Sequence, residues 1–334
     1  MTYPKIELHL HLEGAVRPEL LLRIARRNGF GLPAADVEGL QSLYEFRDFA
    51  HFIEVYILTV SALRTERDFR EVVTSYAAEA KAHGAVYVEA IFGPTDSVRA
   101  GAGWDEVFSG YCDGAQQAWE EHGVRVNLTP DIGRQFTPEE SAEAGRHAAR
   151  YRDRGVVGLG LGGLEAEHPP EAFEAIFAEA RAAGLASLPH AGEVAGPASI
   201  RGALGALGAD RIRHGIRAVD EPALVRELAD RGTVLDVCPI SNVRTRAVAS
   251  LDVHPLPRLH RAGVRCSLAT DDPAMFGTDL GREHAEAVGR WGIDPRDFYA
   301  AGVAGAVCDD ATRAWLREIG DRYDWERVSP AGAA

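Results

Sequence analysis

Histidine and carboxylate side chains occur at four points of the sequence where short apolar segments end. They stand in Ile6-Glu-Leu-His-Leu-His-Leu-Glu-Gly-Ala15, in His190-Ala-Gly-Glu193, at His214 and in Asp271-Asp272-Pro273. Residues i and i+2 of a strand face the same side, so His9 and His11 would point together. Two imidazoles on one face form half of a zinc site, although a hydrogen-bonded pair of core histidines is an alternative.

Three histidines and one carboxylate would suit Zn²⁺ and leave room for water. We expect one zinc ion per chain, with four ligands: His9, His11, His190 and Asp271. Bound zinc lowers the pKa of water from 15.7 to about 7, which supplies hydroxide at neutral pH. These residues therefore predict a metal-assisted hydrolysis.

Two further residues would handle protons in such a reaction. Glu193 lies three residues after His190, where it could carry a proton without binding the metal. His214 would hold or deprotonate the attacking water. Alternatives remain, since His214 could be a satisfied core histidine and Asp271-Asp272-Pro273 could cap a helix.

Elements that place these side chains together can be read from the apolar pattern. Eight apolar, mostly β-branched runs predict buried strands at 5–10, 85–92, 124–129, 156–161, 185–189, 211–214, 233–237 and 264–269. Helical periodicity separates them, and several helical stretches end at glycine. The alternation predicts an α/β protein, a (β/α)8 barrel whose active site lies at the carboxyl ends of the strands. All four polar clusters fall at such ends.

The connection after the first predicted strand is long. Amphipathic segments at 18–28 and 46–63 predict extra helices inserted there, which would form a lid over the barrel. We expect a single domain over 1–327 and a disordered tail over 328–334.

Composition limits the partners. The 334 residues are 46% hydrophobic and 26% charged, with a formal net charge of −14. An acidic chain without a basic run argues against nucleic acid, and no apolar run reaches the ~18–20 residues of a membrane helix. We expect a small-molecule substrate and a cytoplasmic protein, since the first residues lack the features of a signal peptide. The oligomeric state stays open.

Cysteine and lysine usage restrict the metal site further. The four cysteines lie far apart, which disfavours both disulfides and a thiolate zinc site. Two-metal amidohydrolases on this barrel usually bridge their ions with a modified lysine from the fourth strand. The segment Val156-Val-Gly-Leu-Gly-Leu-Gly-Gly-Leu-Glu165 has no lysine, so a single metal is favoured. The His-x-Glu and Pro-Cys-x-x-Cys signature of cytidine deaminases is also missing.

Together these motifs resemble the adenosine and adenine deaminase family of the amidohydrolase superfamily. The resemblance covers nearly the whole chain and includes Glu-Leu-His-Leu-His-Leu-Glu-Gly14, His190-Ala-Gly-Glu-Val, Arg-Ile-Arg-His214-Gly, Cys238-Pro-Ile-Ser-Asn and Ala-Thr-Asp-Asp-Pro273. It implies a (β/α)8 barrel with one zinc that adds water to C6 of a 6-aminopurine and releases ammonia. Fe²⁺ can occupy similar sites.

The resemblance also implies roles for single residues. The zinc ligands would be His9, His11, His190 and Asp271, with Asp271 and His214 among the catalytic groups. Glu193 would donate a proton to N1 of the purine. Asp272 would accept a hydrogen bond near N7, and the backbone N–H of Gly163 would meet N3.

Two departures from the family bear on the substrate. Many adenosine deaminases carry Asp where this chain has Glu13, near the ribose 5′ hydroxyl, and the stretch Gly158-Leu-Gly-Leu-Gly-Gly-Leu-Glu165 matches neither adenosine nor adenine deaminases. The chain thus resembles the deaminases of 6-amino-6-deoxyfutalosine, an intermediate of the alternative menaquinone route. Adenosine and adenine are the alternative substrates, and a catalytically silent binding protein ranks last. The benzoate group of 6-amino-6-deoxyfutalosine is an anion, so we expect a cationic side chain near the lid to bind it. The candidates are Arg17, Arg47 and Arg64.

Overall fold

Eight parallel strands form the centre of the molecule. The computed structural model describes residues 3–47 and 49–329. The strands pair in chain order: β1 (Lys5–His11), β2 (Ala85–Phe92), β3 (Arg125–Gly133), β4 (Gly158–Gly162), β5 (Ala186–Ala191), β6 (Ile212–His214), β7 (Val234–Val237) and β8 (Arg265–Leu268). The expected (β/α)8 barrel is confirmed, and each predicted strand overlaps an observed one.

The barrel closes where β1 meets the segment after β8. Leu10 pairs with Asp271 in a parallel bridge, the N–H of His11 donates to the carbonyl of Asp271 at 2.7 Å, and the N–H of Asp271 donates to the carbonyl of His9 at 3.1 Å. This seam lays two histidines of the first strand beside an aspartate more than 250 residues away. Closure of the barrel therefore assembles part of the site.

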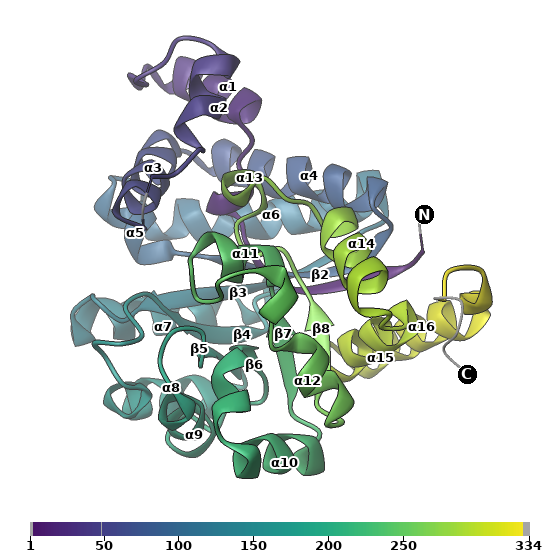
Figure 1. Ribbon diagram of the computed structural model, residues 1–334. Coiled ribbons are helices and arrows are strands. Elements are labelled where there is room, and N and C mark those ends of the chain that lie inside the picture. The colour runs from purple at the N-terminus through teal and green to yellow at the C-terminus, as the bar shows by residue number, and fades with distance from the viewer. Residues whose placement is uncertain (1–2, 48, 330–334) are drawn as a thin grey trace.

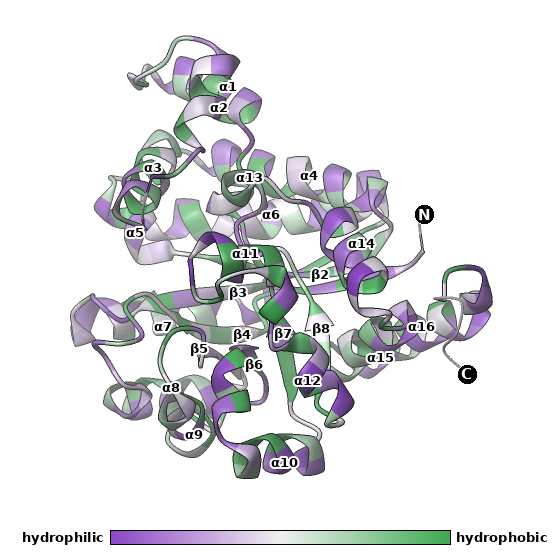
Figure 2. Cartoon of the chain, in the orientation of Figure 1, coloured by the Kyte–Doolittle hydropathy of each residue, from purple (hydrophilic) through white to green (hydrophobic). Residues whose placement is uncertain are grey.

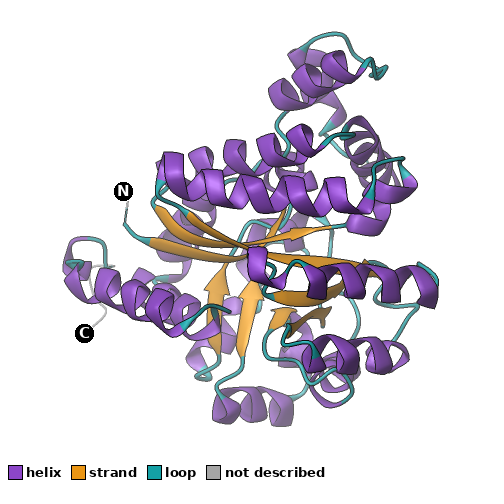
Figure 3. Cartoon of the chain, turned by 180° about the vertical axis from the view of Figure 1, so that it is seen from behind, coloured by secondary structure: helices purple, strands orange, loops and turns teal. Residues whose placement is uncertain are grey.

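Helices surround the strands on all sides (Figures 1 and 3). They are α1 (Pro18–Asn28), α2 (Val37–Leu43), α3 (Phe49–Ala62), α4 (Glu66–Ala82), α5 (Pro94–Arg99), α6 (Trp104–His122), α7 (Pro138–Arg150), α8 (Glu174–Ala182), α9 (Pro197–Gly205), α10 (Pro222–Arg231), α11 (Pro239–Arg244), α12 (Leu256–Arg261), α13 (Pro273–Phe276), α14 (Leu280–Trp291), α15 (Pro295–Gly305) and α16 (Asp310–Arg322). Single 3₁₀ turns lie at η1 (Glu13–Ala15), η2 (Arg152–Arg154), η3 (Pro170–Phe173), η4 (Ile216–Asp220), η5 (Leu251–Val253) and η6 (Trp325–Arg327).

Of the extra helices after β1, α3 packs against η1 and α5, the segments that follow the carboxyl ends of β1 and β2. Helix α1 matches the predicted 18–28, because Pro18 starts it and Gly29 ends it with φ 63°. The segment predicted as one helix over 46–63 begins at Phe49, with the separate α2 before it. Phe52 of α3 stacks on Phe276 of α13 with ring centroids 5.2 Å apart, and α3 also contacts η1 and α5. Figure 1 shows α1 and α2 projecting beyond these contacts.

The core and the chain end complete the fold. Apolar residues run along the central strands, whereas the helices show mixed polarity (Figure 2). Val328 is 8% exposed and the Ser329 hydroxyl donates to Asp294 at 2.7 Å, so the packed region extends past the predicted boundary at 327. The rest of the predicted tail, 330–334, lies outside the described residues. Over the described chain, no helix is long and apolar enough to cross a membrane.

Candidate active site

The four predicted metal ligands converge at the carboxyl ends of the strands. His9 and His11 come from β1, His190 from the end of β5, and Asp271 from the segment after β8. The Nε2 atom of His190 lies 3.1 Å from that of His9 and 3.2 Å from that of His11. Asp271 Oδ1 lies 3.3 Å from the Nε2 atoms of both His9 and His11. The structure therefore brings all four together, as the sequence predicts.

Hydrogen bonds and burial influence how these four side chains are protonated. His190 Nδ1 lies 3.1 Å from the carbonyl of Leu161 and 3.2 Å from Asp131 Oδ2, both acceptors. These acceptors place a proton on Nδ1, so the neutral form of His190 would present a bare Nε2 to the cluster. Burial lowers the pKa of His11 to about 4 and that of His9 well below its usual range. Burial opposes the ionisation of Asp271, but His9 holds the pKa of Asp271 well below normal.

A divalent metal fits this arrangement. Tetrahedral coordination with ligand bonds of about 2.0–2.2 Å requires ligand atoms about 3.3–3.6 Å apart, close to the separations found here. The four ligand atoms all lie within 4.8 Å of one another. Neutral imidazoles and one carboxylate are also the donors that zinc and related metals accept. The fit to a metal therefore rests on the types of these four donors and on their close spacing.

Two residues that the sequence reasoning missed hold His190 in place. Asp131, near the end of β3, lies between His190 and Arg213 of β6, and the Arg213 guanidinium donates to it. Burial would raise the pKa of Asp131, but Arg213 holds it well below its usual range. The sequence did contain a signal for Asp131, because this carboxylate follows the predicted strand at 124–129, at the end where barrel active sites lie. Its partner could not be inferred, because Arg213 lies 82 residues away.

Glu193 sits in a loop that another missed residue shapes. The carboxylate of Glu165 accepts the backbone N–H groups of residues 192–195, and the hydroxyl of Ser199 at 2.6 Å. Glu193 itself accepts a hydrogen bond from the Thr245 hydroxyl at 3.2 Å. Burial first, and then the neighbouring Asp271, raise the pKa of Glu193 to about 8. The raised pKa favours the protonated form of Glu193, the form in which a carboxyl group can donate a proton.

His214 and Asp271 share an unusual backbone conformation. Their φ angles are 62° and 65°, in the left-handed region that few residues other than glycine adopt. Such strain is held by surrounding structure and clusters at functional sites. His214 Nε2 lies 3.5 Å from Glu193 Oε2 and 3.8 Å from Asp271 Oδ2. The hydroxyl of Ser241 donates to the same Oδ2 at 2.5 Å, so the two oxygens of Asp271 face different partners.

The predicted purine-binding residues line the same mouth. Asp272 is 6% exposed, and burial and then Asp271 raise its pKa well above normal. A side chain at Gly14 would come within 1.8 Å of Asp272 Oδ1, which explains the glycine there. Gly163 follows β4 with φ 91° and borders Gln135.

Glu13 is fully buried beside this group. Its Oε1 accepts the Gly93 N–H at 2.9 Å and the Tyr111 hydroxyl at 3.2 Å. Its buried Oε2 has no hydrogen-bond partner among the described residues. Burial raises the pKa of Glu13 to about 7. One oxygen of this predicted substrate-binding residue is therefore buried and unpaired.

Comparison with known proteins decides the family. Residues 4–322 match the sequence profile of the family described as adenosine deaminase. This chain belongs to the adenosine deaminase family. The expected fold, family and enzyme class, a deaminase that hydrolyses a purine C–N bond, are thereby confirmed.

Three relatives of this deaminase illustrate the similarity. The aminodeoxyfutalosine deaminase of Acidothermus cellulolyticus is 51% identical over 329 residues, which cover 96% of this chain and 92% of that protein. The crystal structure of an adenine deaminase from Arthrobacter aurescens has a TM-score of 0.91 at 32% identity, covering 97% and 100% of the two chains. A Burkholderia ambifaria amidohydrolase with bound Zn has a TM-score of 0.87 at 28% identity, covering 96% and 90%.

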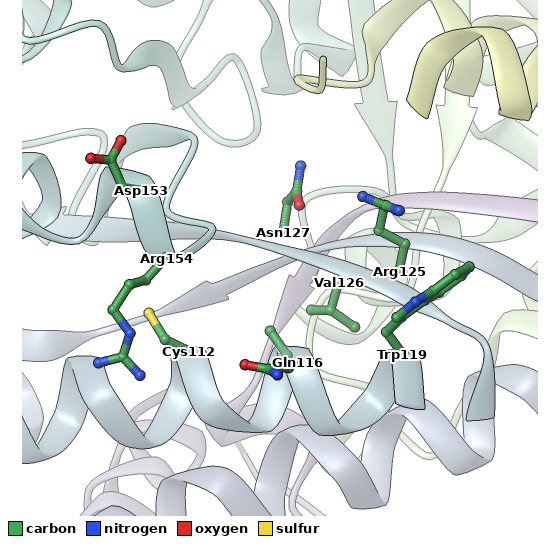
Figure 4. Close-up of a pocket in the computed structure, with 9 residues that line it drawn as sticks. Cys112, Gln116, Trp119, Arg125, Val126, Asn127, Asp153 and Arg154 are labelled. Atoms are coloured by element: carbon green, nitrogen blue, oxygen red, sulfur yellow. The ribbon is translucent and has the colours of Figure 1, made fainter. Parts of the chain in front are cut away.

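A hollow elsewhere on the deaminase is separate from this cluster. It measures about 340 Å³ and lies between α6 and the start of β3, lined by Cys112, Trp119 and Arg125 among others (Figure 4). It lies at the amino-terminal side of β3, whereas the histidine cluster lies at strand carboxyl ends. Burial raises the pKa of Cys112 to about 12, so its thiol is not a ready nucleophile.

Proposed function

We propose that this deaminase hydrolyses the C6–N bond of 6-amino-6-deoxyfutalosine, giving futalosine and ammonia, in a step of menaquinone biosynthesis. Water supplies the new C6 oxygen; one of its two protons completes ammonia with the leaving amino group, and the product retains the equivalent of the other on N1. The observation that carries this choice is the 51% identity to the relative of that name over nearly all of both chains. We expect a cytoplasmic enzyme with a small-molecule substrate.

The metal ligands in this proposal are His9, His11, His190 and Asp271, holding one Zn²⁺ per chain. When bound, such an ion lowers the pKa of water to about 7 and makes it a nucleophile at neutral pH. Support comes from the geometry of the four ligand atoms and from the bound Zn in the Burkholderia ambifaria structure. Fe²⁺ is the alternative metal.

Proton transfers fall to two carboxyl groups. Glu193, with its raised pKa, would donate a proton to N1 of the purine as C6 becomes tetrahedral. Asp271 Oδ2, which faces His214 and Ser241, would receive the proton of the attacking water. His214 would orient that water from its position between the two carboxyl groups.

Purine recognition follows from the protonation of the neighbouring carboxyl. Because the pKa of Asp272 is raised well above normal, its carboxyl would donate a hydrogen bond to the acceptor N7, the reverse of the direction expected from sequence. The Gly163 N–H would meet N3, and the free Oε2 of Glu13 would face the sugar.

The benzoate end of the substrate needs a cation at the rim. The Arg17 guanidinium pairs with the carboxylate of Glu79 and donates to the carbonyls of Pro273 and Thr278. Its charge is therefore already paired within the protein. We propose Arg47 and Arg246 instead. Both are exposed, Arg246 Nη2 donates to the Arg47 carbonyl at 3.4 Å, and Arg246 follows Thr245, which contacts Glu193. The contact joins the segment before α3 to the loop after α11.

Adenine is the second candidate substrate, favoured by the fold similarity to the Arthrobacter aurescens adenine deaminase over its whole length. Ammonia release from aminodeoxyfutalosine, adenosine, 2′-deoxyadenosine and adenine, measured side by side, separates the candidates. We expect the highest kcat/KM on aminodeoxyfutalosine. An equal or higher value on adenosine or adenine would overturn that choice. The variants Arg47→Ala and Arg246→Ala should raise KM for aminodeoxyfutalosine and leave KM for adenosine unchanged.

A further inference from the structure

His214 is linked to the protein backbone through two buried side chains. The N–H of Leu256 donates to His254 Nδ1 at 3.1 Å, His254 Nε2 lies 3.1 Å from Asn242 Oδ1, and Asn242 Nδ2 lies 3.2 Å from His214 Nδ1. Asn242 is 0% exposed and His254 is 4% exposed. Asn242 belongs to α11 and His254 lies between η5 and α12. Three segments of the chain are therefore joined in one line of hydrogen bonds.

The direction of these hydrogen bonds is fixed at one end. A backbone N–H can only donate, so His254 Nδ1 is an acceptor. Burial lowers the pKa of His254 to about 4, so the ring is neutral and its one proton is on Nε2. That proton requires the amide oxygen of Asn242 as its partner, which turns the amide NH₂ toward His214. His214 Nδ1 must then accept, and a neutral His214 carries its proton on Nε2.

We propose that Asn242 and His254 are positioning residues that hold His214 as the Nε2–H tautomer. His214 then presents a hydrogen-bond donor between Glu193 Oε2 and Asp271 Oδ2, which lie 3.5 and 3.8 Å away. With a bare Nε2, His214 would offer no donor toward Asp271 Oδ2. In this tautomer His214 can orient the attacking water but cannot take its proton. The catalytic consequence rests on the proposed function, whereas the tautomer does not.

Nuclear magnetic resonance of ¹⁵N-histidine-labelled, zinc-loaded protein reads the tautomer without substrate. The His214 signals are identified by their loss in His214→Ala. We expect the wild type to show a protonated Nε2 and a bare Nδ1. In Asn242→Asp, the carboxylate can accept from both histidines at nearly the same positions, so the proton of His214 should move to Nδ1. A wild-type His214 protonated on Nδ1, or an unchanged tautomer in Asn242→Asp, would overturn the proposal.

Kinetics separates positioning from a merely structural role. In a serine-protease triad, the wrong histidine tautomer lowers kcat by about 10⁴-fold, and we expect Asn242→Asp to lower kcat by at least about tenfold. KM and metal content should change less than about twofold, because neither residue touches the metal or the purine. Equal kcat in Asn242→Asp and wild type would overturn the proposal.

Substitution of His254 provides a matched pair. His254→Gln keeps an N–H donor near the position of Nε2, whereas His254→Phe fills the space without a donor. We expect kcat to fall at least about tenfold in His254→Phe and to be largely recovered in His254→Gln. Equal losses in the two variants would mean that the donor is irrelevant and would overturn the proposal. If the wild type releases no ammonia from any purine, the proposed function fails, and the His214 tautomer still decides this inference.

Discussion

Two clusters of polar and charged side chains are buried inside the barrel, and they differ in whether they contain a cationic side chain that pairs with their carboxylates. Toward the amino-terminal ends of the strands, Arg211 pairs with Glu89 at 2.7 Å and with Asp236 at 2.5 Å. All three are at most 1% exposed. Ser267 donates to Asp236 and Tyr87 donates to Glu89. Each charge in this lower cluster has a partner within the protein.

The upper cluster, at the carboxyl ends, consists of His9, His11, His190 and Asp271 and contains no cation of its own. Four of the six separations between its ligand atoms are 3.1–3.3 Å, and all six pairs of atoms lie within 4.8 Å. Imidazole and carboxylate side chains gathered this closely suit a metal ion, which would supply the missing positive charge. Burial is common to both clusters, but only the lower one contains an arginine that pairs with its carboxylates, and this difference is why we propose the upper one as the metal site.

The largest effect is expected from loss of the acid beside the upper cluster. Glu193→Gln removes the proton that would reach N1, so kcat should fall by about 10²–10⁴-fold. Metal content and melting temperature should stay as in the wild type, because Glu193 is not a ligand. Assays of ammonia release and metal analysis check this, with Glu167→Gln, an exposed residue of the β4–η3 segment, as control. Full activity in Glu193→Gln would refute its role as acid.

A substitution in the lower cluster should lower the stability of the protein and leave its metal binding intact. Arg211→Met leaves two buried carboxylates without their cation, which should cost about 3–5 kcal/mol of stability. Calorimetry should show a clear fall in melting temperature, while the folded protein keeps its metal. Arg201→Met removes an exposed arginine paired with Glu221 and Glu227 and should change little. If both variants melted alike, or if folded Arg211→Met lost its metal, the distinction between the clusters would be wrong.

A smaller effect, on metal affinity, is expected from Asp131, the carboxylate that pairs with Arg213 and lies beside His190. Asp131→Asn weakens the hold on His190 Nδ1 and should lower metal affinity by about 10–100-fold. Titration against a competing chelator measures it. Asp153→Asn, which alters an exposed carboxylate, is the control and should leave the affinity unchanged. An unchanged affinity in Asp131→Asn would remove Asp131 from the metal site.

Much of this molecule could be predicted from sequence because its signals are local. The strand at 85–92 and the helix at 18–28 have the predicted bounds, since apolar periodicity and Pro and Gly at helix ends act over a few residues. The four predicted metal ligands converge because barrel closure brings strand ends together. The partners Arg213 of Asp131 and Glu79 of Arg17 were missed, because side-chain pairing across 82 and 62 residues depends on packing between elements.

Metal stoichiometry tests the central claim most directly. Mass spectrometric metal analysis of the purified protein should find one zinc or iron ion per chain. His190→Ala should lose that ion and all ammonia release, whereas Arg211→Met should keep the ion in its folded fraction. A fully active protein without metal, two ions per chain, or a His190→Ala variant that binds metal as the wild type does would contradict the account.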